Sequence, residues 1–155
     1  MTGMWIWLEN TDLAMWVGLS LWAYPSLLAL HIVGLAVVVG IFSMRDLRLL
    51  GLTRGLLPID FILPVRFALA GFVLNAISGF LLFTSQASVF VNSTSFLVKI
   101  SCITLGMLLA WRIQVRLSAR MDQDRVTHTT RLLAFVSLLC WASAIVAGRL
   151  IAYLG

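Results

Sequence analysis

Four long apolar stretches constrain the fold more than any other feature of this sequence. They run from about residue 25 to 44, 64 to 84, 96 to 115 and 131 to 154. A helix needs roughly 20 mostly apolar residues to cross the hydrocarbon core of a bilayer. Each stretch has that length and composition. The sequence therefore predicts an all-α integral membrane protein built as a bundle of four transmembrane helices.

The composition supports one transmembrane domain rather than a soluble protein. Of the 155 residues, 61% are hydrophobic and 11% are charged, whereas a soluble domain averages roughly a quarter charged residues. A soluble fold of this size has too little interior to bury so much apolar surface, but a bilayer removes the need for a polar exterior. Four spans with their loops and a leader segment account for residues 1–155, so we expect a single domain.

The positive net charge of +5 is explained by membrane orientation. Basic residues gather at one set of predicted helix ends, namely Arg45, Arg48, Arg54, Arg66, Arg112, Arg116, Arg120, Arg125 and Arg131. The segments flanking the opposite ends carry Glu9 and Asp12. Because cytoplasmic loops carry the excess of Lys and Arg, loops 45–63 and 116–130 are predicted inside and both termini outside. We expect no binding to nucleic acid, and Arg45 and Asp46 are expected to form a boundary ion pair.

Residues 1–20 differ in character from the four spans. They mix Trp5, Trp7 and Trp16 with the acidic residues Glu9 and Asp12. Indole rings favour the boundary between the hydrocarbon and the headgroups. We therefore predict an interfacial segment at the outer surface, with a short or re-entrant helix as the alternative.

Three ionisable residues inside the predicted spans are candidate functional groups, because such groups are costly in a membrane. His31 lies six residues inward from Pro25, which is about 9 Å along a helix. Lys99 lies three residues from the outer end of the third span, and Arg149 lies five residues from the outer end of the fourth. The predicted topology places all three in the outer half of the bundle.

This combination favours a haem b site. A neutral histidine is the usual protein ligand of haem iron and also binds copper and zinc. Lys99 and Arg149 are placed to pair with haem propionates, and Gly34, one turn inward of His31, offers room for a flat macrocycle. The alternatives are an interhelical hydrogen bond for His31, cations that extend to the headgroups, and a packing role for Gly34.

Three segments resemble a small bacterial membrane family of unassigned function. They are LHIVGLAVVVGIFSMRDLRLLGL at 30–52, SFLVKISCITLGMLLAW at 95–111 and LLCWASAIVAGRLIAYL at 138–154. A histidine in the first span paired with a lysine in the third is also similar to two better-understood groups. These are the four-helix, haem-b-containing protoporphyrinogen oxidase of bacteria and the membrane domain of the copper resistance protein D family.

The resemblance implies roles for individual residues and a location in the bacterial inner membrane with a periplasmic N-terminus. By similarity to the oxidase, His31 is the axial haem ligand and Lys99 is its partner or a second ligand. By similarity to the unassigned family, Arg149 belongs to a recurrent ending, here GRLIAYLG. The sequence departs from the pattern at Trp111, where relatives are expected to carry a histidine, which weakens a two-histidine site.

Together these features lead to the expectation of a b-type haem protein that transfers electrons as a subunit of a membrane redox assembly. We expect partner subunits or quinone as donor or acceptor, with self-association as a further possibility, and no enzymatic activity of the chain alone. Copper handling is the first alternative, although copper requires further histidines or nearby methionines that the chain lacks around His31. A cofactor-free structural or assembly subunit is the second alternative.

Overall fold

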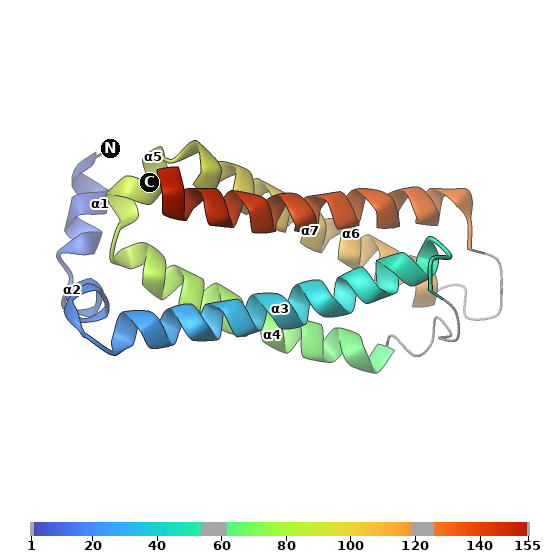
Figure 1. The fold of residues 1–155 in the computed structure, drawn as a ribbon, viewed down its shortest axis with the longest axis horizontal. Coiled ribbons are helices and arrows are strands. Elements are labelled where there is room, and N and C mark those ends of the chain that lie inside the picture. The colour runs from blue at the N-terminus through green and yellow to red at the C-terminus, as the bar shows by residue number, and fades with distance from the viewer. Residues whose placement is uncertain (1, 54–61, 119–125, 155) are drawn as a thin grey trace.

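The computed structural model describes residues 2–53, 62–118 and 126–154 and consists of helices throughout these ranges, without strands (Figure 1). The helices in chain order are α1 (Thr2–Glu9), α2 (Asp12–Leu19), α3 (Ala23–Leu49), α4 (Ile62–Thr84), α5 (Ala87–Asn92), α6 (Thr94–Ser118) and α7 (His128–Leu154). The prediction of an all-helical chain is confirmed.

Four of these helices are long and apolar enough to cross a membrane. The spanning segments are Ala23–Leu49, Pro64–Thr84, Thr94–Ser118 and His128–Ile151. They coincide with the four predicted spans and indicate a multi-pass membrane protein. The first is longer than predicted, because helix α3 continues through Arg45 and Asp46 instead of ending at Met44. It stops where Gly51 adopts a φ of +83°, a conformation that glycine reaches without strain and that commonly ends helices.

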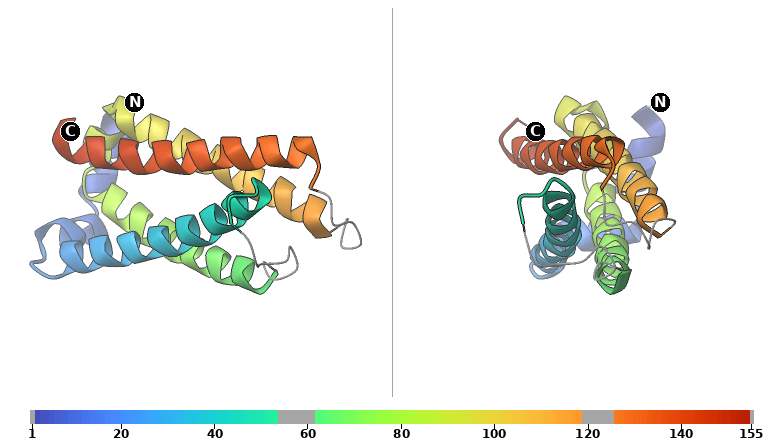
Figure 2. Two further views of the ribbon diagram at one scale, coloured as in Figure 1. Left: turned by 45° about the vertical axis from the view of Figure 1, so that its right-hand side comes forward. Right: turned by 90° about the vertical axis from the view of Figure 1, so that its right-hand side faces the viewer.

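The long helices form two closely packed pairs, α3 with α4 and α6 with α7, and the pairs meet mainly through α3 and α7 (Figure 2). Glycine permits the close approach within the first pair. A Cβ atom at Gly34 would lie 2.8 Å from the backbone oxygen of Gly71, and a Cβ atom at Gly71 would lie 2.9 Å from Val37 Cγ1. Small residues at such contacts are the usual way in which membrane helices approach one another.

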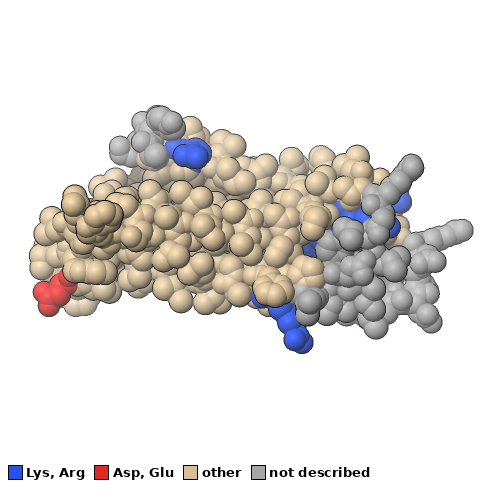
Figure 3. Space-filling model, turned by 60° about the horizontal axis from the view of Figure 1, so that its bottom comes forward, with Lys and Arg blue, Asp and Glu red and all other residues tan. Residues whose placement is uncertain are grey.

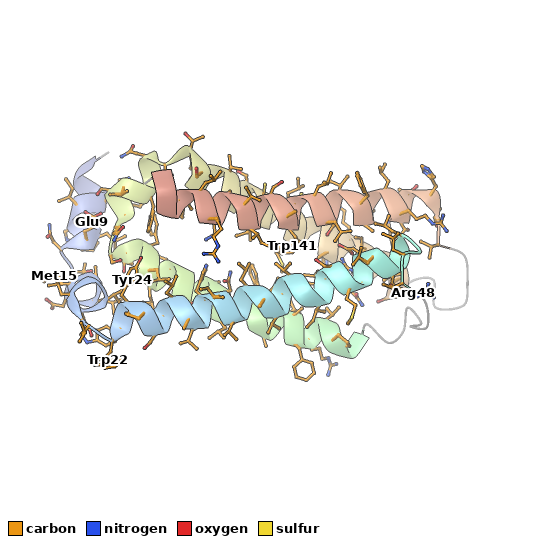
Figure 4. The ribbon with its side chains drawn as sticks, viewed as in Figure 1. Glu9, Met15, Trp22, Tyr24, Arg48 and Trp141 are labelled. Carbon is orange, nitrogen blue, oxygen red and sulfur yellow. The ribbon has the colours of Figure 1, made fainter. Side chains whose placement is uncertain are left out.

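A core cluster of Val38, Phe42, Ala68, Ala110 and Trp141 joins the two pairs. The rings of Phe42 and Trp141 stack with centroids 5.7 Å apart and planes 16° apart. Trp141 also lies against Gly106 of α6, where a Cβ atom would be 3.3 Å from the indole. Figure 4 shows Trp141 on the side of α7 that faces α3.

The short helices α1, α2 and α5 lie at one end of the long helices, which is also where both chain termini are found (Figure 1). Glu9, at the end of α1, accepts hydrogen bonds from the backbone N–H of Ser88 (2.8 Å) and from its hydroxyl (2.7 Å). Aromatic rings complete this end: Phe83, Phe90 and Phe96 stack on one another, and Trp5 meets Phe83 edge-on.

Residues 2–19 therefore form two helices of eight residues each. Each is about 12 Å long, too short to span a bilayer. Their location at the membrane interface stays a prediction. On the face shown in Figure 3, an acidic group lies at one end of the molecule and basic groups lie mainly toward the other, with a long uncharged surface between them.

Candidate functional site

His31 of α3 is oriented by helix α4. Its Nδ1 atom lies 2.9 Å from the backbone oxygen of Asn75 and 3.3 Å from the hydroxyl oxygen of Ser78. A backbone carbonyl can only accept a hydrogen bond, so Nδ1 must carry a proton. The Ser78 hydroxyl donates to the backbone oxygen of Leu74 at 2.7 Å, which leaves its oxygen free to accept from Nδ1–H. In the neutral imidazole, the lone pair is therefore on Nε2.

Gly79 provides the surface on which the imidazole lies. A Cβ atom at this position would be 2.7 Å from His31 Cε1 and 3.1 Å from Nδ1. Both distances are shorter than an ordinary carbon contact of about 3.5 to 4.0 Å. Any side chain at position 79 would displace the ring. The sequence carried a signal for this surface, because the polar residues Asn75 and Ser78 precede Gly79 inside an otherwise apolar span.

Lys99 of α6 is the charged residue that interacts electrostatically with His31. Its side chain lies along α7, where a Cβ atom at Gly148 would be 3.6 Å from Cε and 3.7 Å from Nζ. The ammonium group is close enough to His31 to interact electrostatically with the imidazole. His31 thus lies against Gly79 of α4 and Lys99 lies against Gly148 of α7, and an electrostatic interaction links the two helix pairs through these residues.

Arg149 is not joined to this group by any direct contact. It follows Gly148 in sequence and is therefore at the same level of α7 as the Lys99 side chain, but its own side chain is exposed. Within the described part of the chain, Arg149 forms no ion pair or hydrogen bond. The structure thus places the two cations at a similar level of the bundle and leaves the Arg149 side chain exposed.

The structure also shows the surroundings of Gly34 and Trp111, two positions that the sequence analysis singled out. Gly34 is buried against α4, so its missing side chain serves the α3–α4 contact, the alternative that the sequence left open. Trp111 is 64% exposed on α6. A histidine at that position would consequently be on an exposed part of the α6 surface.

Few side chains that could coordinate a metal ion lie around His31. Among the residues that the structure describes, no three His, Cys, Asp or Glu side chains converge into a group that could hold a metal ion. His31 Nε2 has no hydrogen-bond partner in this part of the chain. One imidazole nitrogen with an available lone pair, beside a lysine, is what the region offers to a ligand.

A second polar group, the Arg45–Asp46 pair, lies on the same helix but farther along it. The predicted ion pair is confirmed, with Arg45 Nη2 and Nε at 2.8 and 3.0 Å from Asp46 Oδ1. Both side chains are 0% exposed, so the pair is buried within the protein, and its position at the membrane boundary stays a prediction. The pair is buried because Arg45 also donates to the backbone oxygen of Ala110 at 3.1 Å and lies 5.0 Å above the Phe42 ring.

Comparison of the chain with models of protein families, with curated proteins and with solved structures found no match.

Proposed function

We propose that this chain is a b-type haem protein of the bacterial inner membrane, with His31 as the axial ligand and both termini on the periplasmic side. The observation that carries the proposal is the hydrogen bond from His31 Nδ1 to the backbone oxygen of Asn75. A histidine that ligates a metal commonly donates its other ring N–H to a carbonyl or carboxylate, which fixes the tautomer and the ring orientation. His31 has this second contact, and its Nε2 lone pair is available.

The donor set favours haem over a bare metal ion. A haem iron receives four nitrogen ligands from the porphyrin and needs only one or two from the protein. A bound copper or zinc ion takes most of its ligands from side chains. One available imidazole nitrogen fits the first requirement, whereas copper would need further ligands from a partner subunit or a second copy of the chain.

The depths of Lys99 and Arg149 in the bundle suit the propionates of a haem. Lys99 is five residues from the start of α6 and Arg149 is five residues from the end of α7, so each is about 7.5 Å from its helix end. His31 is eight residues from the start of α3, about 12 Å deep. Propionates directed toward the nearer membrane surface would therefore meet Lys99 and Arg149, while the ring is held more deeply by His31.

When bound, the haem would supply one-electron chemistry, and the chain would supply the ligand, the orientation and a low-dielectric surrounding. The functional assignment is an electron-transfer subunit that exchanges electrons with partner subunits or with quinone. His31 would be held by Asn75 and Ser78, the α4 backbone at Gly79 would limit its rotation, and Lys99 would balance negative charge at the outer side. This assignment requires no catalytic residue in the chain itself.

The decisive experiment is an absorption spectrum of the purified protein, oxidised and reduced with dithionite, from cells supplied with haem precursors. We expect a Soret band with reduced α and β bands, lost in His31→Ala and retained in His128→Ala. His128 is the matched control, since it is the other histidine and is exposed at the start of α7. A colourless wild-type protein, or equal spectra in both variants, would refute the proposal. Copper in the colourless protein would favour copper handling, and its absence a structural subunit.

The proposed orientation has its own test. Single cysteines at Leu52 and Gln86, near opposite ends of the long helices, are compared in a Cys102→Ala, Cys140→Ala background. A membrane-impermeant maleimide applied to cells with a permeabilised outer membrane should label Gln86→Cys and should label Leu52→Cys only after lysis. The reverse pattern would place the termini in the cytoplasm.

A further inference from the structure

Three buried polar atoms near the Arg45–Asp46 pair lack a hydrogen-bond partner among the described residues. They are Asp46 Oδ2, Ser137 Oγ and Trp141 Nε1. Asp46 and Ser137 are 0% exposed and Trp141 is 1% exposed. A polar group that is buried without a hydrogen bond destabilises the folded protein. Each of these three atoms would therefore gain from a hydrogen-bond partner of its own chemistry.

The three atoms belong to one contact between α3 and α7. Ser137 and Trp141 are four residues apart on α7 and so lie on the same helix face. The Ser137 hydroxyl is close enough to interact with the Asp46 carboxylate, although the two groups do not meet in the geometry of a full hydrogen bond. Trp141 is fixed against α3 by its stacking on Phe42, whose ring also carries the Arg45 guanidinium.

The chemistry of these atoms selects a small neutral ligand. Asp46 Oδ2 can only accept a hydrogen bond, Trp141 Nε1–H can only donate, and the Ser137 hydroxyl can do both. Arg45 already balances the carboxylate through Oδ1, so a cation would meet the guanidinium and an anion would meet the carboxylate. A water molecule in a protein interior typically has 2 to 4 polar partners, and this contact offers three.

We propose that a water molecule is bound between α3 and α7, where it accepts from Trp141 Nε1–H and donates to Asp46 Oδ2 and Ser137 Oγ. It gives a hydrogen-bond partner to each of these three atoms. The site lies where the two helix pairs are joined, and it is independent of the proposed haem site near His31. The rival arrangement is dry: the indole donates to Ser137 and the Ser137 hydroxyl donates to Asp46.

The test is nuclear magnetic resonance of the full chain in detergent micelles, with ¹⁵N in the indole groups. The Trp141 signal is assigned from its loss in Trp141→Phe. We expect a rotating-frame cross-peak between Trp141 Nε1–H and the water resonance, comparable to those of the exposed indoles of Trp7 and Trp22. Absence of the cross-peak in wild type would overturn the proposal.

The variant Ser137→Ala distinguishes the bound water from the rival arrangement, in which the indole, Ser137 and Asp46 bond directly to one another. A water held by Asp46 and Trp141 keeps its cross-peak in this variant, whereas a signal relayed through the exchanging Ser137 hydroxyl disappears. Retention supports the proposal and loss overturns it. Should Ser137→Ala fail to fold, deuterium exchange of the wild-type indole N–H decides. Exchange at a rate comparable to that of the backbone amides at the helix ends supports a water contact, and protection as strong as that of the central α3 amides overturns it.

Discussion

The buried Arg45–Asp46 pair gives the sharpest stability prediction. Replacing Arg45 by Met removes the guanidinium, and with it two hydrogen bonds to Asp46 Oδ1, one to the backbone oxygen of Ala110 and the contact with Phe42. The carboxylate is then buried without its partner. Removing one member of a buried ion pair costs about 3 to 5 kcal/mol, while replacing both members by apolar residues is often far less costly. We expect Arg45→Met to lower the free energy of unfolding by that amount.

The measurement is reversible unfolding in mixed micelles with rising sodium dodecyl sulfate, followed by circular dichroism. The double variant Arg45→Met, Asp46→Leu should be more stable than Arg45→Met alone, because it removes the unpaired charge as well as its partner. Arg112→Met is the control, since Arg112 is exposed on α6, and surface changes usually fall within about 0.5 kcal/mol. Equal losses for Arg45→Met and Arg112→Met, or a double variant less stable than the single one, would refute the reasoning.

Three further predictions follow from close contacts. Gly79→Ala should displace the His31 ring and reduce haem content several-fold in the reduced-minus-oxidised spectrum, whereas Gly40→Ala, with open space around its Cβ position, should leave the spectrum unchanged. Gly34→Ala should destabilise the chain by about 1 to 3 kcal/mol through overpacking against α4; a neutral effect in the same unfolding assay would contradict the close α3–α4 contact. Glu9→Gln should weaken the hydrogen bonds to Ser88 and increase amide exchange in α1 by mass spectrometry while α3 and α4 stay protected; unchanged exchange in α1 would argue against this anchor.

The positions of the four long helices could be predicted from the sequence, because each requires only an uninterrupted apolar stretch of sufficient length. The end of α3 could not be predicted so well. From the sequence, Arg45 and Asp46 were predicted to follow the end of the first span, but in the structure both lie within helix α3 and are buried in the protein. Their burial depends on Ala110 and Trp141, which come from helices more than 60 residues later in the sequence.

For the candidate site, the sequence predicted how deep each residue lies along its helix but not the helix face on which its side chain lies. Counting residues from the helix ends placed His31 and Lys99 at similar levels, and the structure brings them within electrostatic reach. Rotation about each helix axis is set by packing between helices and has no local sequence signal. Gly34 and Gly79 illustrate this point, because both are glycines in apolar spans, yet Gly34 meets the α4 backbone and Gly79 meets the imidazole.

The proposed haem and a purely structural role account differently for the charge around His31. An interhelical hydrogen bond alone would explain His31, because Nδ1 is bonded to Asn75. A structural role would need a separate explanation for Lys99, an ionisable group in another helix suited to span a membrane, such as extension of its ammonium group toward the headgroups. In the described part of the chain Lys99 forms no ion pair, and Glu9 is bonded to Ser88. A ligand that presents a metal to Nε2 and carboxylates to the ammonium would account for both residues at once, whereas a bare cation would be repelled by Lys99.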